Sequence, residues 1–190
     1  MRIYLDCDDV LFPFTQGILE ACNQKHGTTL TLDDVHDWEV DTVLPAGTHW
    51  WDFTDVPGFY RDLEPLPGAR SLVDAVRASG RPWGFLTSLP IKHESSNVLE
   101  ERRICIDNNF SMGGYEIPSR RLIVAKRKDL VVHPGDVLVD DYEYNIEAVE
   151  AVGGIGLLVA HPSNRSSKRP RWPLNQICAW VLSHRKVKGA

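Results

Sequence analysis

An apolar run that ends directly in carboxylates is the feature that most limits how this chain can fold. Residues 3–5 are Ile-Tyr-Leu, and Asp6, Asp8 and Asp9 follow almost at once. The run is typical of a buried strand, and alternation along a strand predicts that Asp6 and Asp8 point to the same side. Two like charges that close require a cation, a raised pKa or both. The alternative is that Asp8 and Asp9 form a polar turn, since aspartate is a favoured turn residue.

A second stretch of the chain repeats this pattern. Residues 135–141 read Gly-Asp-Val-Leu-Val-Asp-Asp, a short β-branched strand that ends in Asp140 and Asp141. The carboxyl ends of parallel strands form the ligand crevice of α/β sheets, so the two acidic pairs are expected to meet there. Carboxylates from separated segments suit Mg²⁺, which takes the rest of its ligands from water and a substrate phosphate. The sequence therefore predicts a Mg²⁺ site.

Two further strand ends carry polar groups, and each allows two interpretations. The strand predicted from Trp83 ends in Thr87 and Ser88, which either cap the next helix or hold a phosphoryl oxygen with their hydroxyls. Residues 126–128, Lys-Arg-Lys, follow the strand predicted at 122–125. They form either a solvated basic turn or the source of one lysine that neutralises the carboxylates and a phosphate.

Strands and helices alternate along most of the chain. Helical spacing follows the first strand from Phe14, and Thr31 with Asp34 resembles a capping box that opens a short helix. Further helices are expected after Gly68, at 142–152 and at 174–184, and a last strand at 155–159. This order predicts an α/β fold with a doubly wound parallel sheet.

Residues 37–60 are rich in aromatic side chains and are interrupted by proline and glycine. The group forms either the core of a small helical insertion or a surface that stacks on a flat base. Stacking of this kind contributes roughly 1–3 kcal/mol per base. The aromatic residues are Trp38, Trp50, Trp51, Phe53, Phe59 and Tyr60.

Composition limits the class of protein. A chain of 190 residues with 43% hydrophobic content is expected to form one domain plus a small inserted subdomain. The net charge of -5 argues against a general nucleic-acid-coating protein. The cationic stretch at 163–171 favours a solvated linker over nucleic-acid binding. The 4 cysteines lack Cys-x-x-Cys spacing, so zinc and disulfides are weakly supported.

Location and assembly are less constrained by the sequence. No apolar run approaches membrane-spanning length, and Asp6 interrupts the apolar core that a signal peptide needs. We therefore predict a cytoplasmic protein without a membrane partner. The oligomeric state stays open, with a homodimer as one option.

The acidic and polar strand ends together resemble a known superfamily. Asp6-x-Asp8, Thr87-Ser88, Lys128 and Asp140-Asp141 are similar, in that order, to the four motifs of the haloacid dehalogenase (HAD) superfamily of phosphotransferases. Residues 57–69, 86–90 and 135–141 resemble the 5'(3')-deoxyribonucleotidases within it, and the similarity spans most of residues 1–160. The resemblance implies a Rossmann-like core of residues 1–13 and 64–190 and a small helical cap at 14–63.

The resemblance also implies an activity, the Mg²⁺-dependent hydrolysis of nucleoside, especially deoxyribonucleoside, monophosphates. Asp6 would be the nucleophile that forms an aspartyl-phosphate. Asp8 would be the general acid and base, its pKa raised above about 3.9 by crowding with other carboxylates. Asp6, the backbone carbonyl of Asp8 and Asp141 would hold Mg²⁺, with Asp140 as the partner of Asp141. The spacing from Asp141 to Asn145 favours that choice.

The remaining implied roles concern the substrate. Thr87, Ser88 and Lys128 would stabilise the phosphoryl oxygens, with Lys126 as the alternative lysine, and Phe14 and Trp38 would contact the base. Asp9 stands where the family commonly has glycine. Two other functions remain open. They are a HAD phosphatase acting on another small phosphate or a nucleic-acid 3'-end, and a non-catalytic binding module, which the full acidic set disfavours.

Overall fold

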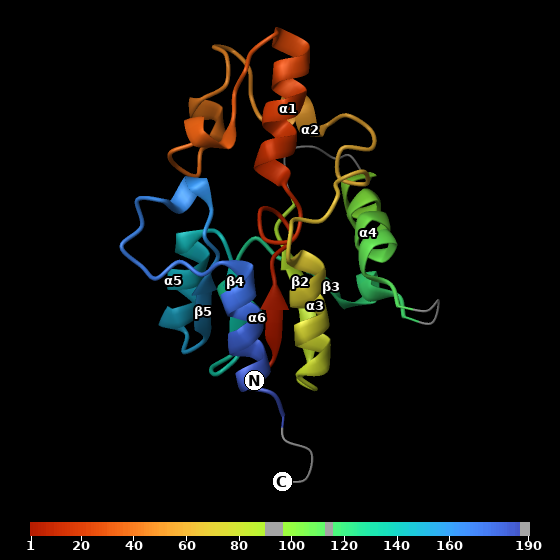
Figure 1. Cartoon of the computed structure of the whole chain (residues 1–190), viewed down its shortest axis with the longest axis vertical. Coiled ribbons are helices and arrows are strands. Elements are labelled where there is room, and N and C mark those ends of the chain that lie inside the picture. Colours follow the sequence, from red (N-terminus) through yellow and green to blue (C-terminus); the bar gives the residue numbers. More distant parts are fainter. Residues whose placement is uncertain (90–96, 113–115, 187–190) are drawn as a thin grey trace.

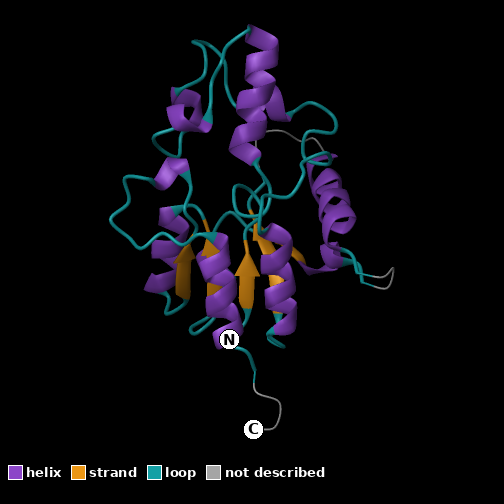
Figure 2. Ribbon diagram, viewed as in Figure 1, coloured by secondary structure: helices purple, strands orange, loops and turns teal. Residues whose placement is uncertain are grey.

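A parallel five-stranded sheet forms the centre of the computed structural model, which describes residues 1–89, 97–112 and 116–186 (Figures 1 and 2). The strand order is β3-β2-β1-β4-β5, so the first strand is central. All neighbouring pairs run parallel, which confirms the predicted α/β class. The strands are β1 Ile3–Leu5, β2 Trp83–Thr87, β3 Leu122–Val124, β4 Val137–Asp140 and β5 Ile155–Leu158.

Helices cover both faces of the sheet. Ile3 and Leu5 of β1 belong to one hydrophobic cluster with side chains of α3, α4 and α6, whereas Tyr4 packs on the opposite side with α5 residues. This two-sided burial explains why β1 is an uninterrupted apolar run. The helices are α1 Phe14–His26, α2 Trp51–Thr54, α3 Ala69–Ala78, α4 Asn97–Phe110, α5 Glu143–Ala151 and α6 Leu174–Ser183.

The segment between β1 and α3 has a hydrophobic cluster of its own. It includes α1 and α2 and lies beyond the carboxyl ends of the strands (Figure 1). The predicted capping box between Thr31 and Asp34 is present, but it opens a single 3-10 turn, Leu32–Asp34. The separate cluster supports the predicted division into 14–63 and the rest, which stays a prediction. The cluster consists of Ile18, Leu19, Cys22, Val35, Val40, Leu44 and Phe53.

The acidic segment after β1 is a tight turn and not a continuation of the strand. β1 ends at Leu5, and the carbonyl of Cys7 accepts hydrogen bonds from the amides of Leu11 and Phe12, each at 2.9 Å. Strand alternation is therefore the wrong reason for expecting Asp6 and Asp8 together. The turn brings them to the same end of the sheet. Asp9 has a φ of 52°, in the left-handed region that aspartate tolerates better than most residues.

Gly84, in β2, tests the packing around the sheet. A Cβ atom there would lie 2.9 Å from the carbonyl oxygen of Arg121, too close for an unshifted backbone. We expect Gly84→Ala to lower the free energy of unfolding by about 1–3 kcal/mol, the usual range for overpacking. Chemical denaturation measures it. Arg120→Ala, at an exposed neighbour of the contacted residue, should change stability by less than about 0.5 kcal/mol. Equal stability of Gly84→Ala and the wild type would contradict this packing.

Candidate active site

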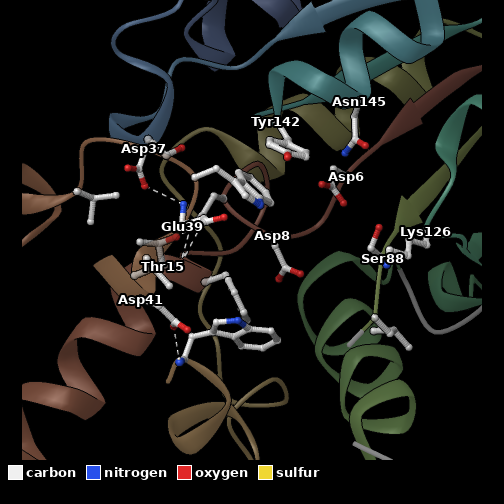
Figure 3. Close-up of a pocket in the computed structure, with 18 of the residues that line it drawn as sticks. Asp6, Asp8, Thr15, Asp37, Glu39, Asp41, Ser88, Lys126, Tyr142 and Asn145 are labelled. Carbon is white, nitrogen blue, oxygen red and sulfur yellow. Dashed lines mark hydrogen bonds between the residues drawn. The ribbon is translucent and has the colours of Figure 1, made fainter. Parts of the chain in front are cut away.

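A cavity of about 680 Å³ lies between the strand ends and the inserted segment, residues 14–63 (Figure 3). Most of the predicted site residues line it, and they come from segments that are far apart in the sequence. Thr87, Asp140 and Asp141 are the exceptions, because their side chains are buried and do not line the cavity. The predicted residues that line the cavity are Asp6, Asp8, Phe14, Trp38, Ser88, Lys126 and Lys128.

Lys128 is the cation at the floor of the cavity. Its Nζ atom lies 2.7 Å from a carboxylate oxygen of Asp6 and 2.7 Å from one of Asp140, and the side chain is 2% exposed. Burial alone would lower the pKa of Lys128, but Asp140 and Asp6 more than offset this and raise it above its ordinary value. Lys126 lines the cavity without an ion pair of this kind among the described residues. The geometry thus favours Lys128 over Lys126.

Asp140 and Asp141 differ in their hydrogen bonding. Asp140 accepts from Lys128, from the backbone amide of Tyr142 at 2.8 Å, and from the Asn145 side chain at 3.1 Å. Both carboxylate oxygens of Asp141 are buried and lack a hydrogen-bond partner within the described ranges. The Asn145 amide therefore meets Asp140 and not Asp141, although the spacing correctly placed Asn145 at this site.

The unpartnered Asp141 carboxylate is the observation that fits a metal. Burial, followed by the nearby Asp9 and Asp140 charges, raises its pKa well above the ordinary value. Leaving a buried carboxylate unpaired is costly, and a cation removes that cost. Oxygen atoms of Asp6, Asp140 and Asp141 lie within 4.8 Å of one another. An all-oxygen set of this kind suits a hard divalent cation.

The two carboxylates predicted to react are held differently. Burial, with help from Asp140 and Asp8, raises the pKa of Asp6 to about 7 against the opposing effect of Lys128. The pKa of Asp8 is also raised, with burial as the largest cause and Arg102 opposing it. The predicted direction for Asp8 is thus correct, but burial and not crowding is the main reason.

Arg102, a residue that the sequence analysis did not single out, contacts Asp8. It lies on α4, is fully buried, and donates a hydrogen bond from Nη2 to Oδ1 of Asp8. Its spacing from Val98 and Ile106 was the available signal, since this places the arginine on the buried face of the helix. A charged residue at an apolar position of a helix usually has a specific partner.

The carboxylate of Asp9 stabilises the turn after β1 through hydrogen bonds. Its carboxylate accepts from the Thr15 amide at 3.0 Å and from the Thr15 hydroxyl at 2.5 Å. The Nε2 atom of His161 lies 3.7 Å from Asp9, and Nδ1 of His161 lies 4.0 Å from Asp141. The polar-turn alternative therefore describes Asp9, which ties the turn to the start of α1, although both Asp8 and Asp9 line the cavity.

The two hydroxyl groups at the end of β2, those of Thr87 and Ser88, lie at different depths. The Thr87 hydroxyl donates to the carbonyl of Ser88 at 3.3 Å, and the Ser88 hydroxyl donates to the carbonyl of Ala125 at 3.2 Å. Only Ser88 of the two lines the cavity. The alternative in which these residues cap the next helix falls partly on residues 90–96, which lie outside the described residues.

The two predicted base contacts have different surroundings. Phe14 packs against the rings of Trp50, Phe59 and Tyr60, with centroid separations of 5.8–5.9 Å. Trp38 is 46% exposed and stacks on Tyr142, with ring centroids 3.9 Å apart and an interplanar angle of 23°. Tyr142 also lines the cavity. The sequence analysis missed it as a site residue, although it directly follows Asp140 and Asp141.

The cationic stretch at 163–171 is partly neutralised by the fold. Arg169 forms ion pairs with the carboxylates of Glu143, Glu147 and Glu150 on α5, at 2.6–3.5 Å. These ion pairs hold Arg169 against α5, whereas the sequence analysis expected a solvated linker. Within the part of the chain that the structure describes, no helix is long and apolar enough to span a membrane.

Comparison with solved structures defines the class of the fold. A HAD family hydrolase from Deinococcus radiodurans, solved with bound phosphate and sodium, superimposes with a TM-score of 0.57 at 16% identity over 96% of this chain and 95% of the other. A HAD-superfamily hydrolase from Ehrlichia chaffeensis gives 0.53 at 10% identity over 96% of each chain. The fold is that of the HAD hydrolases.

Sequence comparison then gives the family. A protein of Bordetella bronchiseptica named "Putative 5'(3')-deoxyribonucleotidase" is 30% identical over 146 residues, 74% of each chain, and its Bordetella pertussis counterpart is 27% identical over the same share. Residues 1–172 match the family model of the 5' nucleotidase, deoxy (pyrimidine), cytosolic type C proteins. The chain belongs to this family. It is a HAD phosphatase of the 5'-nucleotidase type, as the motif resemblance predicted.

Because the pKa values of two buried carboxyl groups are raised, we predict that the metal-free protein becomes less stable as the pH rises. The folded protein retains protons on Asp6 and Asp141 above the pKa of about 4 expected when unfolded. The metal-free protein should therefore lose stability as pH rises from about 4 through 7. A divalent cation should raise the melting temperature more at about pH 8 than at about pH 5, because it binds the ionised carboxylates.

Melting curves with a chelator and with added Mg²⁺, for the wild type and Asp141→Asn, measure this effect. The variant should show a flatter pH dependence and a smaller response to the cation. A wild-type melting temperature that is independent of both pH and cation would contradict the assignment.

Proposed function

We propose that this protein is a Mg²⁺-dependent phosphomonoesterase that dephosphorylates nucleoside monophosphates, preferentially deoxyribonucleotides, through an aspartyl-phosphate on Asp6. The observation that carries the proposal is the pairing at the cavity floor, where Asp6 is held by Lys128 beside the unpartnered carboxylate of Asp141. Family membership and the names of the Bordetella relatives support the substrate class.

The reaction follows from the residues on the cavity floor. An Asp6 oxygen attacks phosphorus and the bond to the ester oxygen breaks, while Asp8 gives its proton to that oxygen. Water then attacks the aspartyl-phosphate, Asp8 takes a proton from the water, and Asp6 is released. Lys128 orients Asp6 and balances charge. The Ser88 hydroxyl lines the cavity and would leave the Ala125 carbonyl to donate its proton to a phosphoryl oxygen.

Mg²⁺ would be held by Asp6, the carbonyl of Asp8 and Asp141, with Asp140 supporting them, and when bound it neutralises charge on the phosphoryl oxygens. Thr87, which is fully buried, would support the loop that carries Ser88. The cavity is also lined by Trp38, Tyr142 and Phe14, whose rings suit a nucleobase. A cytoplasmic location and the oligomeric state stay predictions.

A phosphate-release screen tests the function. Deoxyribonucleoside and ribonucleoside monophosphates, sugar phosphates and 3'-phosphorylated oligonucleotides are each assayed with and without Mg²⁺. We expect phosphate release that depends on Mg²⁺, and we expect kcat/KM to be higher for the nucleoside monophosphates than for the other substrates. A preference for sugar phosphates or oligonucleotide ends would replace the substrate class, and absence of release from all of them would indicate a binding module.

Asp6→Asn tests the covalent mechanism. The variant should lose phosphate release by several orders of magnitude, because an amide is a poor nucleophile, while melting at or above the wild-type temperature, since a buried negative charge is removed. Phosphate release and thermal melting measure the two effects. Asp33→Asn, at a side chain that is 95% exposed, is the control and should stay fully active. Near-normal turnover of Asp6→Asn would disprove the aspartyl-phosphate.

Trp38→Ala tests the base contact. Its exposed ring should contribute a stacking-sized increment of roughly 1–3 kcal/mol to nucleotides and little to p-nitrophenyl phosphate. The kcat/KM ratio of the two substrates measures it. Tyr144→Ala is the matched control, since Tyr144 touches Tyr142 but does not line the cavity.

Phe14→Ala is expected to lower the melting temperature as well, because its ring packs against three others. Equal losses on both substrates for Trp38→Ala would show that Trp38 is a packing residue.

A further inference from the structure

Arg102 is a buried cation for which the chemistry proposed above gives no role. The residue is 0% exposed, and its Nη2 atom donates to Oδ1 of Asp8. Its Nε and Nη1 atoms are buried and lack hydrogen-bond partners within the described ranges. A buried ion pair is often no more stabilising than apolar residues of the same volume, so stability alone does not account for an arginine here.

Two aromatic rings contact the guanidinium group of Arg102. Its central carbon lies 4.8 Å from the ring centroid of Tyr60 and 5.7 Å from that of Phe12, and both rings are buried. Cation–π contacts of this kind restrain the direction in which Nη2 points. Arg102 thus contacts Phe12, in the turn that carries Asp8, and Tyr60, near the end of the inserted segment.

The neighbouring residue anchors α4 to the same segment. The carboxylate of Glu101 accepts from the amide of Gly58 at 2.7 Å and from the amide of Tyr60 at 3.2 Å. Glu101 and Arg102, which are adjacent on α4, therefore bind two different segments. Glu101 binds the backbone of residues 58–60, and Arg102 binds the side chain of Asp8. Because α4 is anchored at this point, Arg102 is well suited to fix the orientation of the Asp8 carboxylate that it contacts.

We propose that Arg102 is a positioning residue that fixes the Asp8 carboxylate for proton transfer to the leaving oxygen of the substrate. The ion pair engages Oδ1 of Asp8, so Oδ2 is the atom left to exchange the proton. Asp8 lines the cavity and Arg102 does not, which means that Arg102 acts through Asp8 and not on the substrate. The inference rests on the proposed function for its catalytic consequence.

A double-mutant cycle in thermal stability tests the pair independently of activity. Asp8→Asn, Arg102→Met and the double variant are melted under the same conditions. Asp8→Asn should lower the melting temperature, because it leaves a buried guanidinium without its carboxylate, and adding Arg102→Met should recover part of the loss. Strictly additive shifts would show that the two side chains are not coupled and would overturn the proposal.

Leaving-group dependence tests the positioning role. A nucleotide such as dUMP needs a proton on its leaving oxygen, whereas the nitrophenolate of p-nitrophenyl phosphate leaves without one. We expect Arg102→Met to lower the ratio of kcat/KM for dUMP to that for p-nitrophenyl phosphate by about tenfold or more, part of the factor that general acids supply. Arg102→Lys, which keeps the charge, should give an intermediate ratio.

Arg103→Met is the matched control, because this neighbouring arginine on α4 is exposed. It should keep the wild-type ratio and melting temperature. Equal losses on both substrates in Arg102→Met and Arg102→Lys would indicate a merely structural role and overturn the positioning role. A wild-type enzyme that is inactive on nucleotides but active on other phosphates would overturn the proposed substrate alone, and the ratio would then be measured with the alkyl phosphate that it prefers.

Discussion

The contact of one buried ammonium group with two carboxylates organises this molecule. Lys128 joins Asp6, after the central strand, to Asp140, at the end of the neighbouring strand. The lysine offsets the cost of burying the negative charge of these two carboxylates. The lysine therefore allows negative charge to gather at the carboxyl end of a sheet whose strands are otherwise mostly apolar. The cavity and its chemistry depend on that arrangement.

Most of the carboxylates in the site have an identified cation or hydrogen-bond donor as a partner. Lys128 serves Asp6 and Asp140, Arg102 serves Asp8, and Asp9 is satisfied by hydrogen bonds from Thr15. Asp141 alone among these carboxylates lacks a hydrogen-bond partner within the described ranges. A site in which all acids but one are satisfied by the fold has a defined place for a cation. This distribution says more about metal binding than the number of acidic residues does.

The sequence was sufficient for the sheet, its strand ends and part of the cavity lining, because apolar runs that end in aspartate can be recognised locally. It was not sufficient for Arg102 or Tyr142, whose roles arise from contacts between segments far apart in the chain. The reason given for pairing Asp6 with Asp8 was wrong, since β1 stops at Leu5 and a turn sets their positions. Burial, the main cause of the raised pKa of Asp8, is likewise a property of the assembled fold.

Tyr142 joins the two ends of the cavity. Its backbone amide donates to Asp140 on the floor, and its ring stacks on Trp38 of the inserted segment. A flat base that enters beside these rings exchanges one aromatic contact for another, so its net cost of entry is small. A sugar phosphate has no aromatic ring to offer in exchange, so the stacked rings of Trp38 and Tyr142 stay together. Selection among phosphate esters can thus arise from the stacked Trp38–Tyr142 pair, a contact that an aromatic base can replace and other phosphate esters cannot.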